Sequence, residues 1–358
     1  MSSKLLETAK HAAQMAQKAG ASDARAWAWR SRDVEVEWRD GKLDRIRDNT
    51  TRGISVSLYV DGRYSGNSTA DLRDDAVATF IQNSVKMTRH LAKDEHRRLP
   101  DPARYEGMTT KDLGIMDPSI STINPENRLK LASDLEQSAR AGDKGEIISV
   151  TSSVSDTEAD VACVNTNGFE GERQSTSFWH SVTASIKDQD DRKPRGSAWG
   201  GGRALKDIPD ISGLGEDALE RARAQVGAKQ ISTGVYDVVI ENRCVPTFSR
   251  HLMSPLNGSS LQQKRSYYEG QLGKQIGSKH LTITSDPHLH GGLGSRAWDG
   301  EGMASMPRLV FDKGVLKTFF LDTYYASKLK MDPTTSSMSN LVWDQGKRNL
   351  DKLIKKIK

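Results

Sequence analysis

Cysteine is scarce in this chain of 358 residues, with only Cys163 and Cys244, which lie far apart in the sequence. Two separated cysteines form no disulfide framework, which excludes the small disulfide-stabilised domains and favours a reducing compartment. No apolar run approaches the roughly 20 residues that span a bilayer. Residues 1–20 show an amphipathic helical pattern without the continuous apolar stretch of a signal peptide. The sequence therefore predicts a cytoplasmic protein with no membrane contact.

Apart from its C-terminal residues, the chain carries no excess positive charge. The last twelve residues, KRNLDKLIKKIK, hold six basic residues and one acid, which equals the whole formal net charge of +5. Nucleic-acid-binding proteins more often spread basic residues over a binding face, so nucleic acid is not an expected partner. Leu350, Leu353, Ile354 and Ile357 recur at helical spacing. We expect a packed helix with solvated lysines; contact with a membrane surface or nucleic acid is the alternative.

The fold class predicted for the whole chain is α+β. Residues 1–227 are expected to form an N-terminal domain of helices and antiparallel strands, with sub-lobes at about 1–107 and 124–188. In the first sub-lobe, helical patterns over 3–19 and 71–92 flank runs of alternating apolar and polar residues. Tight turns between these runs are predicted at two Asp-Gly pairs, Asp40-Gly41 and Asp61-Gly62.

The second sub-lobe is no evident repeat of the first. Asn124-Pro125 starts a helix, because asparagine caps a helix and proline suits its first turn. Residues 146–188 alternate as strands do, around an Asn-Gly turn. Residues 189–213 are rich in glycine and charge, and we expect a long loop there.

Residues 228–358 predict a β-rich C-terminal domain. Val235 to Ile240 is interpreted as a buried strand, and a helical stripe follows, made of Val245, Phe248, Leu252 and Leu256. Further strands are expected at 281–285, 308–312 and 315–320. Between the first two lies the unusual stretch DPHLHGGLGSRAWDGEG, residues 286–302. It is therefore expected in a loop between strands, where functional groups are often displayed.

Two groups of residues in this loop are candidates for chemistry. His288 and His290 lie two apart and could chelate a metal on a strand, but the flanking proline and glycines favour a turn in which the rings need not converge. Asp299 and Glu301 could share acid–base work. The alternative is a structural role, with bonds to backbone amides or to the nearby Arg296.

Other common catalytic motifs are absent from the sequence. The glycines of the loop fit neither the dinucleotide-binding fingerprint nor a P-loop. No HExxH zinc motif and no GxSxG nucleophile elbow occur. The residue pattern alone therefore names no enzyme class.

Longer segments of the sequence resemble a known family. GGLGSRAWDGEGM, then RLVFDKGVLKTFFLDTYYASKL and TTSS, is similar to the signature region of the TldD/PmbA family. RSRDVEVEWRDGKLDRIRDNTTRGISVSLYVDGRYSGNST and DEHRRLPDP resemble the family's N-terminal domain. The resemblance implies a cytoplasmic TldD–TldE pair, a metallopeptidase that trims leader peptides and unfolded polypeptides.

The resemblance also indicates which member of the pair this chain is. Zinc-bearing TldD subunits carry HExxxH on a helix, whereas RHLMSPLNG stands here. His251 occupies the first position, Leu252 replaces the glutamate and Leu256 replaces the second histidine. One imidazole does not hold a catalytic zinc. The chain therefore resembles TldE (PmbA), with no catalytic residue, metal or cofactor of its own and with zinc expected in a TldD-like partner.

The resemblance gives the loop a supporting role, because both kinds of subunit carry it. We expect it to shape a peptide cavity or a subunit contact, through His288, His290, Gly294, Arg296, Asp299 and Glu301. Gly302 is expected to permit a tight backbone.

Family members continue for many tens of residues beyond TTSS, so the C-terminal domain is expected to be truncated relative to the family. We then expect exposed strand edges, exposed apolar surface and reduced packing of the helix at 348–357. Two alternatives to the subunit hypothesis remain: a stand-alone peptide-binding protein and a nucleic-acid or topoisomerase-associated factor.

Overall fold

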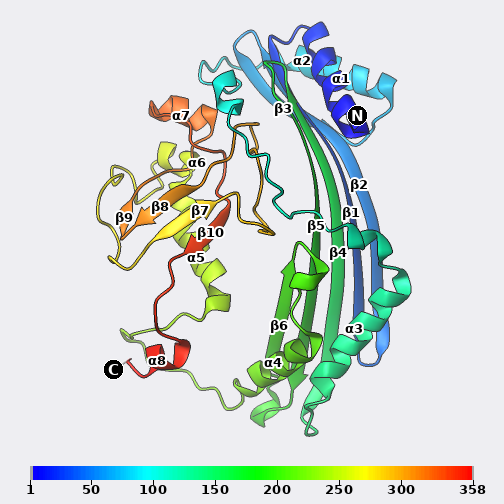
Figure 1. Ribbon diagram of the computed structural model, residues 1–358, viewed down its shortest axis with the longest axis vertical. Helices are drawn as coiled ribbons and strands as arrows, with labels where there is room; N and C mark the ends of the chain where they lie inside the picture. The colour runs from blue at the N-terminus through cyan, green and yellow to red at the C-terminus, as the bar shows by residue number, and fades with distance from the viewer. Residues whose placement is uncertain (1–2, 357–358) are drawn as a thin grey trace.

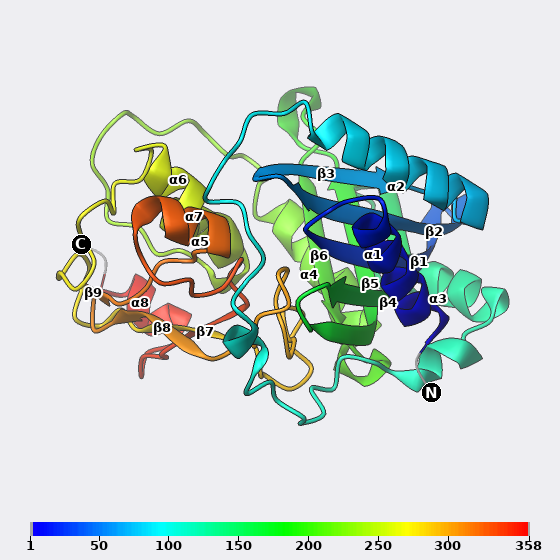
Figure 2. The same ribbon diagram turned by 90° about the horizontal axis from the view of Figure 1, so that it is seen from above.

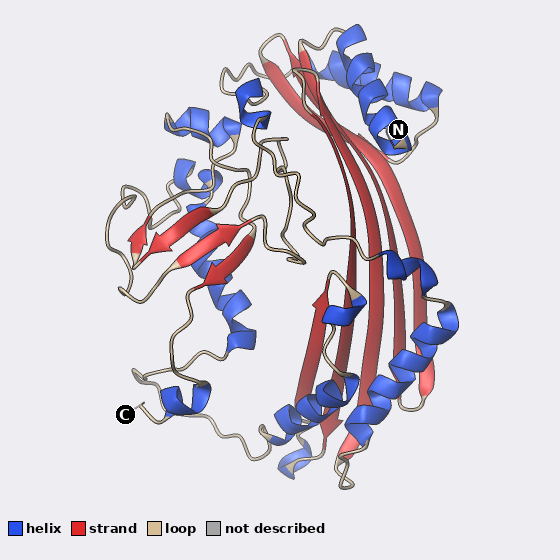
Figure 3. Cartoon of the chain, in the orientation of Figure 1, coloured by secondary structure: helices blue, strands red, loops and turns tan. Residues whose placement is uncertain are grey.

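A computed structural model describes residues 3–356, in which a long curved sheet carries helices on one face and a smaller C-terminal unit on the other (Figure 1). Helices and antiparallel strands are mixed along the chain (Figure 3), which confirms the predicted α+β class. The helices are α1 (Lys4–Lys18), α2 (Asp74–Thr88), α3 (Pro125–Arg140), α4 (Ile211–Arg223), α5 (Val245–Met253), α6 (Gly258–Gln262), α7 (Thr323–Leu329) and α8 (Leu350–Ile354). The strands are β1 (Asp23–Arg39), β2 (Lys42–Val60), β3 (Arg63–Thr69), β4 (Ile147–Asn165), β5 (Glu170–Ile186), β6 (Arg195–Gly202), β7 (Ile283–Asp286), β8 (Arg308–Asp312), β9 (Val315–Leu316) and β10 (Asn340–Trp343).

The large sheet is antiparallel, with strand order β3-β2-β1-β4-β5-β6. Both predicted Asp-Gly turns are confirmed: Asp40-Gly41 joins β1 to β2, Asp61-Gly62 joins β2 to β3, and all four residues have positive φ. β1 pairs with β4 along nearly its whole length, from Arg25 opposite Asn165 to Arg39 opposite Thr151. This pairing joins the two predicted sub-lobes into one sheet.

The two sides of the β1–β4 pair have the same topology. On one side the chain order is α1, the meander β1-β2-β3 and α2; on the other it is α3, the meander β4-β5-β6 and α4. No repeat is evident in the sequence, although the two cores have a similar composition. Alanines form half of the buried residues of the first core and slightly less than half of the second, and the remainder are Val, Leu and Ile.

Helices bury one face of the sheet. Alternate residues of β1, such as Ala24 and Ala26, are fully buried against α1, and Val150 and Val182 are buried against α3 and α4. The approach of α4 to β6 needs glycine, since a Cβ at Gly196 would lie 2.1 Å from a carbonyl oxygen of α4. Seen from above, α1, α2 and α3 lie on the side of the sheet away from the C-terminal unit (Figure 2).

The prediction of a long loop at 189–213 is wrong, because β6 lies within these residues and pairs with β5. Its buried positions are Gly196, Ala198, Gly200 and Gly202. These small residues produce no hydrophobic alternation, so the segment has the composition of a loop although its backbone completes a sheet.

The C-terminal unit contains a small sheet in the order β10-β7-β8-β9. Its described strands hold fewer residues than its helices α5 to α8, so it is less rich in strands than predicted. Its core includes Met253 and Leu256 from the α5 region together with Ile283, Val310 and Phe320. Strands predicted at 281–285 and 308–312 are confirmed within a few residues, and the third is reduced to β9. Burial of the predicted helical stripe is confirmed at its last residue, Leu256, which is fully buried, but not at Phe248, which is 49% exposed.

The prediction of a buried strand at 235–240 is wrong. Among the described residues no strand pairs with this segment, and Val235 and Val238 are 104% and 74% exposed. A strand requires a neighbour for its backbone groups, so a strand-forming composition alone is insufficient. The division predicted at residue 227 stays a prediction; the structure has irregular backbone from 228 to 241.

The predicted C-terminal helix is present as α8, but it buries none of its residues. Leu350, Leu353 and Ile354 are 45%, 38% and 52% exposed, so the helix is not packed as its apolar spacing alone suggested, which agrees with the reduced packing expected from the family resemblance. Ile357 lies outside the described residues. None of the described helices is long and apolar enough to cross a lipid bilayer.

Candidate functional site: the loop between β7 and β8

The loop 286–302 connects β7 to β8, as predicted, and lies against the face of the large sheet that the helices leave open. Trp298 anchors it. The Trp298 ring lies 5.2 Å from that of Trp27 on β1 and 5.3 Å from that of Phe169, and Arg173 of β5 lies over it at 5.3 Å. Large aromatic side chains of this kind dominate the energy of such contacts. The loop therefore joins the C-terminal unit to the sheet.

The two histidines have different surroundings. His288 donates its backbone N–H to Asp286 at 2.8 Å, and its Nε2 is buried without a hydrogen-bond partner. His290 is exposed, and its ring lies on Gly114, where a Cβ would come within 2.4 Å of it. Among residues 3–356, no group of three His, Cys, Asp or Glu side chains could hold a metal ion.

Asp299 holds the backbone of the loop. It is 2% exposed. One carboxylate oxygen accepts the backbone N–H groups of Glu301 at 2.9 Å and Met303 at 3.1 Å; the other accepts the Thr335 hydroxyl at 3.0 Å and the Ser336 N–H at 2.7 Å. Four donors occupy its lone pairs, so this geometry supports the structural role rather than acid–base work.

Glu301 connects the loop to both units. Its Oε1 lies 3.3 Å from Arg25 of β1, and its Oε2 accepts the N–H and hydroxyl of Thr323 at 2.7 and 2.8 Å. Burial raises the pKa of Glu301, while Arg25 and Thr323 oppose that rise. The arginine beside Glu301 is thus Arg25 and not the nearby Arg296, whereas the other expected partners, backbone amides, bind both Asp299 and Glu301.

Arg296 instead binds carbonyl groups, those of Ser337 and Met338. Its Nε is buried without a partner, and burial lowers the pKa of this guanidinium. Gly294 donates its N–H to Asn340 Oδ1 at 2.8 Å, and a Cβ there would lie 3.1 Å from the Asn340 backbone. These contacts bind the loop to the segment that leads into β10.

Gly302 has the tight backbone that was predicted. Its φ is +85°, and a Cβ would meet the Phe169 ring at 2.7 Å. Both the left-handed backbone and the close ring favour glycine here.

Further contacts between the two units involve residues that the sequence did not single out. Arg97 lies between the rings of Tyr64 and Tyr324, at 4.4 and 3.3 Å from their centroids. Tyr324 donates its hydroxyl to Asp94 at 2.9 Å. Arg97, Tyr64 and Tyr324 are distant in the sequence and form no motif, so only the folded structure reveals this cluster.

The α5 region has one imidazole at the position of the zinc motif. His251 is exposed, and its carbonyl accepts the Tyr267 hydroxyl at 3.1 Å. Leu252 packs against the C-terminal core, and Leu256 is fully buried within it. The donor set here does not fit zinc.

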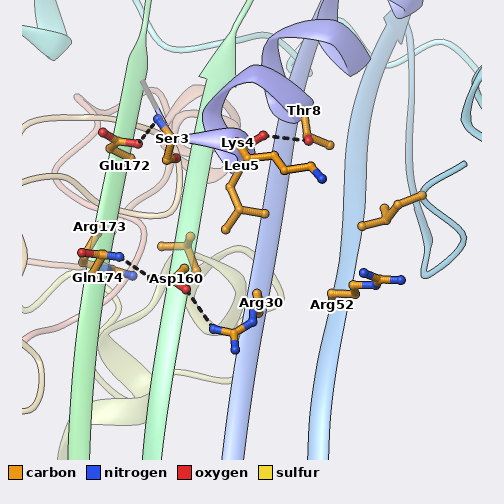
Figure 4. A pocket seen from close by; sticks show the side chains of 12 residues that line it. Ser3, Lys4, Leu5, Thr8, Arg30, Arg52, Asp160, Glu172, Arg173 and Gln174 are labelled. Carbon is orange, nitrogen blue, oxygen red and sulfur yellow. Dashed lines mark hydrogen bonds and ion pairs between the residues drawn. The ribbon is translucent and has the colours of Figure 1, made fainter. Parts of the chain in front are cut away.

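An open hollow of about 630 Å³ lies on the helix-bearing face, below the N-terminus of α1 (Figure 4). Arg30 approaches Asp160 at 3.4 Å, and Gln174 donates to the same carboxylate at 2.8 Å. Lys4 and Arg52 add positive charge and Glu172 adds negative charge. Charges of both signs line the hollow, so it selects no ligand class.

Family models match most of the chain. They describe PmbA/TldA metallopeptidase domain 1 at residues 30–88, the central domain at 118–226 and the C-terminal domain at 233–358. The chain belongs to the PmbA/TldD metallopeptidase family. The predicted family resemblance is thereby confirmed.

Curated members of the PmbA/TldD family are similar over most of this chain. Metalloprotease PmbA of Escherichia coli O157:H7 is 26% identical over 302 residues, covering 84% of this chain and 66% of that protein. The PmbA homologue of Buchnera aphidicola subsp. Acyrthosiphon pisum is 23% identical over 355 residues, covering 99% of this chain and 78% of that one. The chain thus spans slightly less than two thirds of the length of the first relative.

Solved structures of the family share the fold. A Bacteroides thetaiotaomicron protein, named as a candidate modulator of DNA gyrase, is 38% identical with a TM-score of 0.93, covering 98% of this chain and 79% of that one. TldE from Thermococcus kodakarensis has a TM-score of 0.80 and 18% identity, covering 98% of this chain and 80% of that one. The second likeness shows a common fold alone.

Proposed function

We propose that this chain is the TldE/PmbA-like subunit of a TldD/TldE-type metallopeptidase complex and carries no zinc site itself. The observation that carries the proposal is the α5 region. His251 stands alone and exposed, while Leu252 and Leu256 are directed into the core of the C-terminal unit. Zinc peptidases need three protein ligands and a group that activates the bound water. Zinc therefore belongs to a TldD-like partner in this proposal.

The proposed substrates are leader peptides and unfolded polypeptides, and the open face of the large sheet suits them. Trp179 and Trp199 form an aromatic pair there, with centroids 5.9 Å apart, and Trp199 is 54% exposed. Partly or fully exposed hydroxyl side chains surround the pair: Ser153, Thr157, Ser177, Ser181, Thr183 and Ser197. Aromatic rings and hydroxyl groups contact a polypeptide without requiring one sequence.

The proposal gives the loop 286–302 a supporting role. Glu301 joins the C-terminal unit to the sheet through Arg25, while Asp299, Gly294 and Arg296 fix the backbone of the loop within the C-terminal unit. The proposal places the complex in the cytoplasm, in keeping with the free Cys163 and Cys244.

Reconstitution tests the proposal. The purified chain and a TldD-like, HExxxH-bearing chain from the same genome are assayed separately and together on an unstructured peptide. We expect no cleavage by this chain alone, cleavage by the mixture that a chelator abolishes, and less than about 0.1 zinc per chain by elemental analysis, since His251 has no co-ligands. His251→Ala is the matched control and leaves the activity of the mixture unchanged.

The outcomes separate this function from the alternatives. Chelator-sensitive cleavage by the isolated chain, at the same rate with and without the partner, contradicts the subunit assignment. Peptide binding without any copurifying TldD-like chain favours the stand-alone binding protein. The name of the Bacteroides relative favours the third alternative, as do the exposed lysines in and around α8, which are Lys347, Lys352, Lys355 and Lys356. Salt-dependent DNA binding that is lost when residues 347–358 are deleted would establish it.

A further inference from the structure

A pocket of about 230 Å³ lies on the helix-bearing face of the large sheet, away from the loop 286–302. It is formed by α3, by β4 and β5 beneath it, and by the short turn Pro118–Thr122. Its walls are mostly apolar, with Ile123, Leu131, Val154, Phe178 and Leu205 among the lining residues. None of these side chains has a part in the proposed peptidase function.

The charged residues of the pocket neutralise one another. Arg128 of α3 donates through Nε and Nη2 to the two carboxylate oxygens of Asp156 on β4, at 2.6 and 2.8 Å. Its Nη1 donates to the Ile123 carbonyl at 3.1 Å. Both side chains of the pair are 6% exposed. Because the charge of Arg128 is paired with Asp156, the residues that line the pocket offer no unpaired cation to an anionic ligand.

His180 supplies the polar group that lacks a partner. It lies on β5 opposite Val154, lines the pocket and is 5% exposed, and its Nδ1 is buried with no hydrogen-bond partner. Burial lowers the pKa of His180, so the imidazole is neutral near pH 7 and offers one lone pair and one N–H. A buried polar atom without a partner is costly, and a ligand hydroxyl would satisfy it.

We propose that this pocket binds a small uncharged molecule of the phenol class, with the ring among the apolar walls and the hydroxyl bonded to His180. Its size agrees, since an apolar cavity of roughly 150 Å³ accepts benzene, and the additional volume accommodates a hydroxyl and a methyl group. The apolar walls favour the ring, the neutral histidine favours the hydroxyl, and the paired charges disfavour an ion.

The test titrates the full-length chain with p-cresol and follows binding by calorimetry and by the NMR signals of the His180 ring. Toluene has the same ring without the hydroxyl, and benzoate carries a charge. We expect saturable p-cresol binding that shifts the His180 signals, toluene binding at least about fivefold weaker because the hydrogen bond is lost, and still weaker benzoate binding.

Two variants locate the site. His180→Phe removes the preference for p-cresol over toluene, and Leu131→Trp, which fills the pocket, abolishes binding of both. Circular dichroism checks that each variant is folded, and Ile123→Phe replaces Leu131→Trp if that variant unfolds. The proposal is overturned if p-cresol does not saturate within its solubility, if His180→Phe retains the preference, or if filling the pocket leaves binding unchanged.

Discussion

The Arg128–Asp156 pair offers a quantitative test of how burial governs the contribution of an ion pair. Asp156→Asn keeps the shape of the side chain and removes its charge, which leaves Arg128 buried without a counter-ion. Both side chains are 6% exposed, so water compensates for only part of the lost carboxylate. Breaking such a pair typically destabilises a protein by about 3–5 kcal/mol. We expect the free energy of unfolding to fall by about 3 kcal/mol, at the lower end of that range, because asparagine still accepts one hydrogen bond.

The chain contains a matched control in Arg32–Asp48. Here too Nε and Nη2 of an arginine donate to both oxygens of an aspartate, at 3.0 and 2.7 Å, but the side chains are 44% and 49% exposed. Asp48→Asn should lower the free energy of unfolding by less than about 1 kcal/mol, since exposed pairs are weak. Salt should reduce that small loss and leave the loss at Asp156 nearly unchanged.

Urea unfolding followed by far-UV circular dichroism measures both losses, provided that the dependence on urea has the same slope in each variant. Replacing the buried pair together, as Arg128→Met with Asp156→Leu, should recover most of the stability, because no unpaired charge remains. Equal losses at Asp156 and Asp48, or no recovery in the double variant, would refute the reasoning.

Three further predictions concern the loop and the cysteines. Burial raises the pKa of Glu301, so the stability that Glu301 contributes is complete below its ordinary pKa near 4.5 and is lost as pH rises through the raised value. Glu301→Gln should flatten that part of the curve of unfolding free energy against pH, and an unchanged curve would contradict the assignment. Gly302→Ala should lower the free energy of unfolding in urea by about 3 kcal/mol, through backbone strain and contact with Phe169, whereas Gly107→Ala, with φ +78° and no atom within 4 Å, should lower it by only about 1 kcal/mol. Similar losses in the two variants would show that the ring contact is unimportant. Burial raises the pKa of Cys163 to about 12 while Cys244 is exposed, so Ellman's reagent should label Cys244 rapidly and Cys163 only after unfolding; two fast thiols in the native chain would be inconsistent with the structure.

The parts of the fold that the sequence predicts are those with a local signal. Asp-Gly turns and alternating runs locate β1 and β2, and Asn124-Pro125 locates the start of α3, where the structure has a full capping box. Where the signal depends on a distant neighbour, prediction fails. β6 is recognisable only from its pairing with β5, and residues 235–240 have strand-forming side chains but no pairing strand among the described residues.

The candidate loop shows the same limit. Its place between two strands and the need for glycine at 302 could be predicted from nearby residues. The partners of its charged residues could not. Asp299 binds Thr335 and Ser336, and Glu301 binds Arg25, which is distant in sequence. Proximity in sequence suggested Arg296 for both carboxylates, but in the fold that arginine binds carbonyl groups.

The repeated topology of the large sheet has a consequence for how the chain assembles. Each meander forms from neighbouring segments, whereas the β1–β4 pairing joins residues as distant as Arg25 and Asn165. Contacts of such high sequence separation cost more chain entropy than those within a meander, and without them each half-sheet would present its longest edge unpaired. An open edge of that length accepts any extended strand, including the same edge of another copy. Having both halves on one polypeptide raises the local concentration of the correct edge, which makes intramolecular closure faster than pairing between chains.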